Sequence, residues 1–440
     1  MTHKRYEKYI DTEEAWLGSH PSHWARKPLW TLFRRVKRQG FESEELLSVY
    51  RDHGVIPKSS REDNFNKPSD DLSAYQLVEP GDLAVNKMKA WQGSVAISKH
   101  RGIVSPAYHV YTSLHSENQR YLHYLMRCDR YITGYLAISK GIRVNQWDLQ
   151  PEYHSRMPVL LPPLNEQLGI ASFLDRETAK IDALIAEQQR LIELLQEKRL
   201  AVISHAVTKG LNPNAPMKNS GVEWLGEVPE HWDVCRVKAV SVFTTSGPRG
   251  WSERVGDVGA LFVQSGDLTD VMGVDFANCK RVQVGDDAEA SRTKLLDGDL
   301  VVCITGAKTG NVAVCESVPE SSYVNQHLCL IRPGEGVHPR FLAALLKSGC
   351  GQTYFSLAQY GLKQGLSLED VREAPVALPP LDEQDRICQW LRGVSSRYLP
   401  LESESQRTIS LLQERRSALI SAAVTGQIDV RGQVPEAVAA

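Results

Sequence analysis

The residues that most suggest chemistry lie at Thr305-Gly306-Ala307-Lys308-Thr309-Gly310, which has some features of a phosphate-binding loop. In such a loop, backbone N–H groups near glycines and one lysine hold the phosphates of a nucleotide. Here Ala307 precedes the lysine, and Val302 and Cys303 occupy the stretch where the first glycine should stand. We therefore expect no nucleotide-binding site.

Other catalytic signatures are missing. The motifs of zinc proteases, serine hydrolases and kinases do not occur. No lysine follows an acidic residue at the nuclease spacing D/E-x-K, and the Asn/Asp-Pro-Pro-aromatic tetrapeptide of amino-methyltransferases is also missing. The eight cysteines form no C-x-x-C pair, which argues against a zinc site. The sequence predicts no catalytic residue, no metal site, and reduced, mostly buried thiols.

Composition is that of an ordinary globular protein. The 440 residues suggest two to four domains, and 42% hydrophobic and 24% charged residues are typical values. No apolar run approaches the ~20 residues of a membrane span. The polar segment 1–9 lacks the apolar core of a signal peptide. We expect a cytoplasmic protein that does not bind membranes.

Two phrases occur twice. Trp16–Trp24 reads W-L-G-S-H-P-S-H-W, and Trp224–Trp232 reads W-L-G-E-V-P-E-H-W. Leu161–Gln167, L-P-P-L-N-E-Q, returns 217 residues later as L-P-P-L-D-E-Q at Leu378–Gln384. A chain with this duplication is suited to presenting two modules of the same kind.

Each L-P-P-L phrase opens a long helical pattern, over 164–207 and 381–425. Apolar and polar residues step by three or four in each, at positions 217 apart, which is heptad-like spacing. In the first helix this seam is Ile170, Leu174, Glu177, Ile181, Leu184, Gln188, Leu191, Leu195, Lys198 and Val202. Because ~40 residues span ~60 Å, the helices are expected to pair with each other, with packing on a core as the alternative. Pro400 predicts a kink or break in the second helix.

Two mixed bodies precede the helices. Gly93-Ser94-Val95-Ala96-Ile97 matches Gly310-Asn311-Val312-Ala313-Val314 at the same offset of 217, whereas the loops at 86–92 and 303–309 differ. A shared frame with different loops suits two recognition modules of different specificity. Residues 19–160 hold 20 Lys and Arg against 14 Asp and Glu, while residues 219–377 hold 14 against 20.

The predicted fold class is α+β, with two mixed α/β recognition domains, two long antiparallel-paired coiled-coil helices and an internal pseudo-twofold repeat. The expected segments are an N-terminal segment 1–18, a first recognition domain 19–160, a helical spacer 161–210, a second recognition domain with its linker 211–377, a second spacer 378–430 and a disordered tail 431–440.

The order of these motifs, occurring twice, resembles the specificity subunit of type I restriction–modification enzymes. The resemblance covers about 9–432. It implies a non-catalytic subunit whose two target recognition domains each read one half of a split site in double-stranded DNA. It also implies that DNA adenine methyltransferase subunits dock on the helices, and that motor–nuclease subunits can join them. S-adenosylmethionine, ATP and Mg would be held by those partners, with no cofactor in this chain.

Base reading needs side chains with hydrogen-bonding groups on loops or helix ends. The candidates in the first body are Lys87, Lys89, Trp91, Gln92, Lys140, Arg143, Asn145 and Gln146. The candidates in the second body are Ser246, Arg249, Trp251, Lys308, Thr309, Asn311, Lys363 and Gln364. Solvated surface is the alternative for each.

The tryptophans and histidines of the repeated phrase are expected to be structural. Trp16, Trp24, Trp224 and Trp232 should anchor each body to the helices, and His23 and His231 should be hydrogen-bonded supports. Two other functions stay open. A coiled-coil assembly protein without DNA recognition would explain the acidic second body, and an autonomous nuclease or methyltransferase is disfavoured by the missing motifs.

Overall fold

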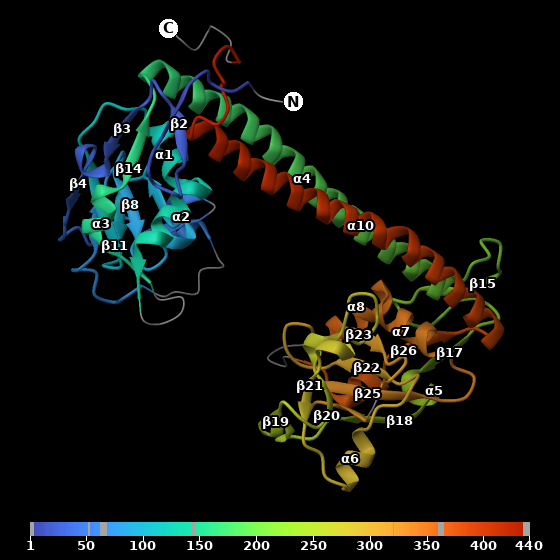
Figure 1. Cartoon of the computed structure of the whole chain (residues 1–440). Helices are drawn as coiled ribbons and strands as arrows, with labels where there is room; N and C mark the ends of the chain where they lie inside the picture. The colour runs from blue at the N-terminus through green and yellow to red at the C-terminus, as the bar shows by residue number, and fades with distance from the viewer. Residues whose placement is uncertain are drawn as a thin grey trace. The chain divides into compact units, whose positions relative to one another are not determined.

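The computed structural model describes residues 4–51, 53–61, 68–141, 147–319, 321–359 and 365–433. The chain forms two compact units (Figure 1). Unit 1 comprises Met1–Gln188 with Arg407–Ala440, and unit 2 comprises Gln189–Gln406. Each unit therefore contains one mixed body and a part of each long helix.

The two long helices are α4 (Leu164–Lys209) and α10 (Leu381–Val424). Each begins directly after Pro-Pro, where the missing proline N–H groups need no helical partner. Both predicted helices are confirmed. The expected break at Pro400 is wrong, because α10 continues through it. Val394 and Ser405, on either side of the proline, are buried, so packing stabilises the helix across the lost hydrogen bond.

The helices pack along each other in both units. In unit 1, Arg416 Nε lies 2.8 Å from Asp182 Oδ1, and in unit 2, Arg199 Nε lies 3.1 Å from Glu402 Oε1. Arg199 and Arg416 are 217 residues apart, so the repeat supplies one interhelical arginine to each unit. The predicted pairing of the helices is confirmed.

The predicted seam is correct at about every second position beyond the start of α4, since Gln188, Leu195 and Val202 are partly buried. Ile170, Leu174 and Ile181 are buried, but Leu184 is 46% exposed. The partly buried Ile185 lies on the packed side instead. Leu191 is likewise exposed, in unit 2, and Ile192 is partly buried. The packed side therefore steps by four and then three residues where three and then four were predicted, which misplaces Leu184, Leu191 and Lys198 by one residue.

The body of unit 1 is built on the four-stranded sheet β4-β11-β8-β9, with smaller strand pairs around it. Helix α1 (Gln119–Arg127) is followed by α2 (Asp129–Ile138) and α3 (Pro151–Arg156). The strands are β1 (Tyr9–Asp11), β2 (Ser19–Pro21), β3 (Ala25–Pro28), β4 (Phe33–Val36), β5 (Leu47–Tyr50), β6 (Gly54–Pro57), β7 (Gln76–Val78), β8 (Leu83–Asn86), β9 (Val95–Ile97), β10 (Gly102–Val104), β11 (Tyr108–Ser113), β12 (Ser139–Lys140), β13 (Asp148–Leu149) and β14 (Pro158–Leu161).

The body of unit 2 repeats this sheet as β18-β25-β22-β23 and has a second four-stranded sheet, β19-β21-β20-β24. Its strands are β15 (Met217–Asn219), β16 (Glu227–Pro229), β17 (Asp233–Arg236), β18 (Ser241–Ser246), β19 (Val255–Gly256), β20 (Ala260–Val263), β21 (Lys280–Val282), β22 (Leu300–Cys303), β23 (Val312–Val314), β24 (Ser322–Val324), β25 (Leu328–Pro333) and β26 (Pro375–Leu378). Its short helices are α5 (Val237–Val240), α6 (Ala288–Thr293), α7 (Pro339–Lys347), α8 (Gly349–Ala358) and α9 (Leu368–Arg372).

The strand registers repeat with the sequence. Leu83 pairs with Ile97 between β8 and β9, and Leu300 pairs with Val314 between β22 and β23, both shifted by 217. This confirms the predicted strand–loop–strand element in both bodies. The fold class is confirmed as well: two mixed α/β bodies with two paired long helices and an internal repeat.

Each body packs against the start of one long helix and the end of the other. In unit 1, Phe173 of α4 and Ala423 of α10 belong to one apolar core. In unit 2, Val207 of α4 and Ile387 of α10 belong to another. The apolar residues at both helix ends therefore serve as part of the cores of the two bodies.

Candidate nucleic-acid interface

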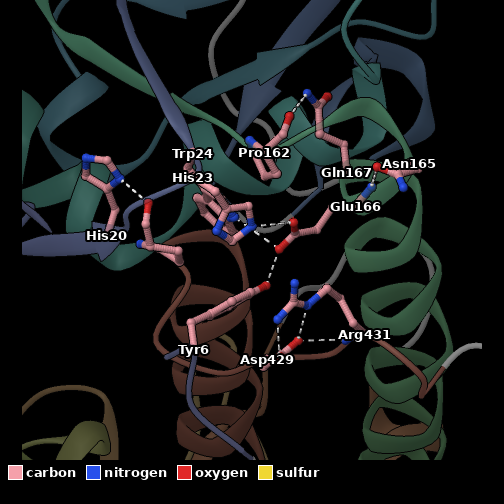
Figure 2. A network of polar contacts seen from close by, with 11 residues as sticks. Tyr6, His20, His23, Trp24, Pro162, Asn165, Glu166, Gln167, Asp429 and Arg431 are labelled. Atoms are coloured by element: carbon pink, nitrogen blue, oxygen red, sulfur yellow. Dashed lines mark hydrogen bonds and ion pairs between the residues drawn. The ribbon is translucent and has the colours of Figure 1, made fainter. Parts of the chain in front are cut away.

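The glutamate of L-P-P-L-x-E-Q joins the first body to its helix. In unit 1, Trp24 Nε1 donates to Glu166 Oε1 at 3.0 Å, and His23 Nε2 lies 2.9 Å from Glu166 Oε2. The Tyr6 hydroxyl donates to the same carboxylate, and Figure 2 shows the three side chains converging on it. Glu166 is 7% exposed, so these partners compensate the burial of its charge.

Unit 2 contains a similar cluster around Glu383, with fewer hydrogen bonds among the described residues. His231 Nε2 lies 2.7 Å from Glu383 Oε2. Trp232 is fully buried and packs edge-on against Phe341, but its Nε1 has no hydrogen-bond partner among the described residues. The predicted support role of both histidines is confirmed.

The other two tryptophans also pack within the bodies. Trp16 lies edge-on to Tyr131 with ring centroids 5.3 Å apart, and Trp224 lies 5.9 Å from Tyr354. Tyr131 belongs to α2, which directly follows α1, and Tyr354 belongs to α8, which directly follows α7. The structural role expected for the repeated phrase is confirmed, although these two rings contact the bodies rather than the long helices.

The glutamine of the same motif closes a second contact in each unit. Gln167 Nε2 donates to the Pro162 carbonyl at 2.8 Å, and Gln167 Oε1 accepts from the Asn118 N–H at 2.9 Å (Figure 2 shows the first bond). Gln384 makes the equivalent bonds to Pro379 and His338. Asn118 and His338 are the N-cap residues of α1 and α7, so the motif fixes both helix starts.

The two ends of the described chain meet in unit 1. The Asp429 N–H donates to the Lys4 carbonyl at 2.7 Å, and the Tyr9 hydroxyl donates to the Gly426 carbonyl at 2.8 Å. The Arg431 guanidinium lies over the Tyr6 ring and pairs with Asp429 at 2.8 Å. These contacts place the first strand beside the end of α10.

The loops that differ between the bodies are held in the same way. The Lys87 N–H donates to the Ala107 carbonyl at 3.0 Å, and the Lys87 carbonyl accepts from the Leu149 N–H at 2.9 Å. In unit 2, Ile304 makes the matching bonds to His327 and Leu366, at 2.9 and 2.8 Å. Each unit therefore presents its variable loop beside the segment that leads into α3 or α9.

The unit 1 candidates lie mostly on this loop. Lys89, Gln92 and Lys140 are exposed, and Lys87 is half-buried. Trp91 donates to the Met88 carbonyl at 3.1 Å, and its ring lies 4.8 Å from that of Trp147, so much of its surface is used in packing. Arg143, Asn145 and Gln146 lie outside the described residues.

The unit 2 candidates are divided. Lys308 and Arg249 are exposed. Thr309 Oγ1 donates to the Gly306 carbonyl at 2.6 Å, Asn311 Oδ1 accepts from Lys347 Nζ at 3.0 Å, and the Ser246 carbonyl accepts from Arg292 Nη1 at 3.0 Å. Lys363 and Gln364 lie outside the described residues.

Trp251 requires a correction. It is 1% exposed and packs against Phe262 and Tyr323, with ring centroids 6.3 and 5.6 Å away. In this conformation it cannot contact DNA, because the second sheet of unit 2 covers it. No pattern along the sequence indicated that sheet.

The structure adds polar residues that sequence spacing did not reveal. His327 Nδ1 lies 2.5 Å from Thr305 Oγ1, and Gln326 Nε2 lies 3.2 Å from His327 Nε2. The Gly247 N–H donates to the Asn325 carbonyl at 3.2 Å, which brings the 246–249 segment to the same turn. The turn 325–327 follows β24, far in sequence from the loop, and no motif marks it.

Buried histidines lie under the unit 1 loop. Burial, with a smaller effect of Arg35, lowers the pKa of His109 to about 4. Burial also lowers the pKa of His154 to about 3, and His154 Nδ1 lies 3.1 Å from the Tyr111 hydroxyl. Both rings are neutral at physiological pH and act as packed supports.

Nothing in the described part of the chain forms a metal site of three or more His, Cys, Asp or Glu side chains. All eight cysteines are free. Burial raises the pKa of Cys128 to about 11 and of Cys329 to about 12, so these groups stay thiols at neutral pH. The prediction of mostly buried, unbridged cysteines is confirmed.

Known proteins share both the sequence and the fold. Residues 251–409 match the family model of the type I restriction modification DNA specificity domain. The EcoKI specificity subunit of Escherichia coli K12 is 19% identical over 93% of this chain and 90% of its own length. The EcoBI specificity subunit of Escherichia coli is 23% identical over 71% of this chain and 66% of its own.

A solved structure described as the structural basis of complex assembly and conformational transition of the type I R-M system has the same fold. Its TM-score is 0.65 at 14% identity, over 93% of this chain and 99% of that one. The two structures therefore share a fold over most of their length. Residues 251–409 resemble a type I restriction modification DNA specificity domain, and most of the chain is similar in sequence to a type I restriction enzyme specificity subunit. Among the described residues, no helix has the length and apolarity of a membrane span.

Proposed function

We propose that this chain reads a bipartite site in double-stranded DNA, one half with each body, and holds methyltransferase subunits on its paired helices. Motor–nuclease subunits would join the same assembly, and S-adenosylmethionine, ATP and Mg would be held by the partners. One observation carries the proposal. The backbone of Lys87 in unit 1 and that of Ile304 in unit 2 make matching hydrogen bonds, while the loops around these two residues differ in sequence. Two loops that are held by the same backbone hydrogen bonds but carry different side chains are suited to reading two different DNA sequences.

Within the described chain, the residues proposed to contact DNA are the candidates from the sequence whose side chains are exposed. They are Lys89, Gln92 and Lys140 in unit 1, and Arg249 and Lys308 in unit 2, with the turn 325–327 beside them. Lysine and arginine contact phosphates, and glutamine and arginine can contact base edges. The segments 19–160 and 211–377 are proposed as the two recognition domains, each followed along the chain by a spacer, 161–210 and 378–430.

Methylome sequencing tests this function. The chain is expressed with its methyltransferase partner in a host without other adenine methylation, and methylated adenines should appear in one split motif. The chain alone should give none. A verified complex that leaves the host genome unmethylated, and that binds no duplex DNA at low salt, would instead favour an assembly protein without DNA recognition.

Exchanging a loop tests the division of labour. Replacing residues 86–92 with another loop should change the bases of one half of the motif only. The replacement of 303–309 is the matched experiment for the other half. If either exchange altered both halves, the two bodies would not be independent readers.

A further inference from the structure

A hollow of about 740 Å³ opens beside the unit 1 loop. Strand β5 forms one wall and residues of the 86–94 hairpin form the other, with the turn at Ser105–Tyr108 between them. Lys89 and Gln92, which are proposed DNA contacts, line its edge. The hollow is therefore continuous with the proposed interface.

The charged residues in this hollow all have one sign. Arg51, Lys58, Arg61 and Lys89 line it, and none of its described lining residues is a carboxylate. The Arg61 guanidinium lies 4.9 Å from the centre of the Tyr50 ring, which holds it at the wall. The exposed side chains of Arg51 and Lys89 share this one space, so their charges act together on an anion.

A hollow in unit 2 is different, and none of the described residues of its 303–309 loop lines it. It measures about 570 Å³, and its charged lining residues, within the described chain, are Asp286 and Lys294, one of each sign. The bodies differ in the same direction, since residues 19–160 carry 20 basic against 14 acidic residues and residues 219–377 carry 14 against 20. Duplex DNA presents about one phosphate charge per 1.7 Å, so it favours the unit 1 hollow.

We propose that the unit 1 hollow binds the phosphodiester backbone of duplex DNA, and that unit 1 thereby supplies most of the salt-dependent affinity of this chain. This rests on the proposed function, because it assigns a phosphate site within the DNA interface. Unit 2 then contributes sequence reading with few phosphate contacts of its own. The two repeated bodies would then differ in their roles, because unit 1 makes most of the phosphate contacts.

The test compares two double variants of the full chain in its methyltransferase complex. Arg51→Gln with Lys89→Gln removes two exposed cations of the unit 1 hollow, and Lys294→Gln with Lys308→Gln removes two lysines from unit 2. Affinity for a random-sequence duplex is measured from about 50 to 200 mM salt. Melting profiles of the variants are compared with the parent to show that folding is retained.

The unit 1 variant should lower the magnitude of the log affinity against log salt slope by about 2, at ~0.9 for each phosphate contact. The unit 2 variant should lower it by less than 1, and the methylated motif should keep its bases in the unit 1 variant. An unchanged slope, in a complex that still methylates its motif, would overturn the phosphate site but not the proposed function. Equal losses in both variants would overturn the unequal division, and a changed motif would make the hollow a base reader. If the parent complex methylated no split motif, the proposed function itself would fail.

Discussion

Trp24 donates its indole N–H to Glu166 at 3.0 Å across 142 residues of chain. The equivalent pair, Trp232 and Glu383, lacks this bond, and within the described chain His231 is the hydrogen-bond partner found for the second glutamate. In unit 1 the carboxylate also accepts from the Tyr6 hydroxyl, and no described residue of unit 2 takes that place. The same sequence phrase therefore gives two glutamate clusters of unequal strength.

Glu166→Ala should destabilise unit 1 by about 2 to 3 kcal/mol, because the buried Trp24 N–H and the Tyr6 hydroxyl lose their acceptor. Glu383→Ala is the matched control and should cost about 1 kcal/mol, since only a hydrogen bond to the exposed His231 is lost. Hydrogen exchange of segments 19–28 and 233–240 separates the two units. Equal loss of protection in both would show that the two glutamate clusters are equivalent after all.

Gly247 has no room for a side chain. A Cβ there would lie 2.1 Å from the Val324 carbonyl oxygen and 2.2 Å from the Asn325 carbonyl carbon. Gly247→Ala should therefore separate β18 from the 325–327 turn, cost about 1 to 3 kcal/mol and impair reading of one half-site. Gly256→Ala, where no atom lies within 4 Å, should behave as the parent in unfolding and methylation assays.

The histidines under the unit 1 loop predict a pH dependence of stability. Burial lowers the pKa of His109 to about 4 and of His154 to about 3, from 6.5 in the unfolded chain. The unfolded state therefore binds more protons between pH 6.5 and about 4. Their stabilising contribution is complete above pH 6.5 and is lost as pH falls, by up to ~1.4 kcal/mol per pH unit for each ring.

This dependence can be measured from hydrogen exchange of residues 105–112 between pH 7.5 and pH 4.5, after correction for intrinsic rates. His154→Leu should flatten the profile in unit 1, whereas His205→Leu, an exposed ring on α4, should leave it unchanged. A profile for His154→Leu with the parent slope would mean that His154 is not neutral in the folded state.

The long helices and the hairpins could be predicted from the sequence more readily than the residues of the candidate nucleic-acid interface. Repeats 217 apart identified both long helices and the β8–β9 and β22–β23 hairpins, because apolar spacing and turn residues are local signals. Leu184 was placed in the seam, yet it is exposed and Ile185 is partly buried, because two adjacent apolar residues fit steps of three and of four equally well. His327 and the packing of Trp251 depend on contacts between distant segments, which spacing along the chain does not encode.

The spacer helices predict control over the gap between the half-sites. Seven residues inserted after Leu194 in α4, within the segment 185–195, together with seven after Ser405 in α10, would lengthen both helices by ~10 Å. The gap in the motif should grow by about three base pairs, at ~3.4 Å each, without a change in the bases read. Insertion in α4 alone should break the Arg199–Glu402 or Asp182–Arg416 pairing and abolish the defined gap. A change of bases with the double insertion would contradict a spacer role.

The hydrogen bond between Asp429 and Lys4 has a practical consequence for labelling. Fluorophores or affinity tags attached near residue 4 or near residue 433 are both carried by unit 1, close to the Glu166 carboxylate. Signals from the two ends would therefore report on the same half of the protein. A probe of the other half has to be attached internally, for example at the exposed Arg249 or Lys308.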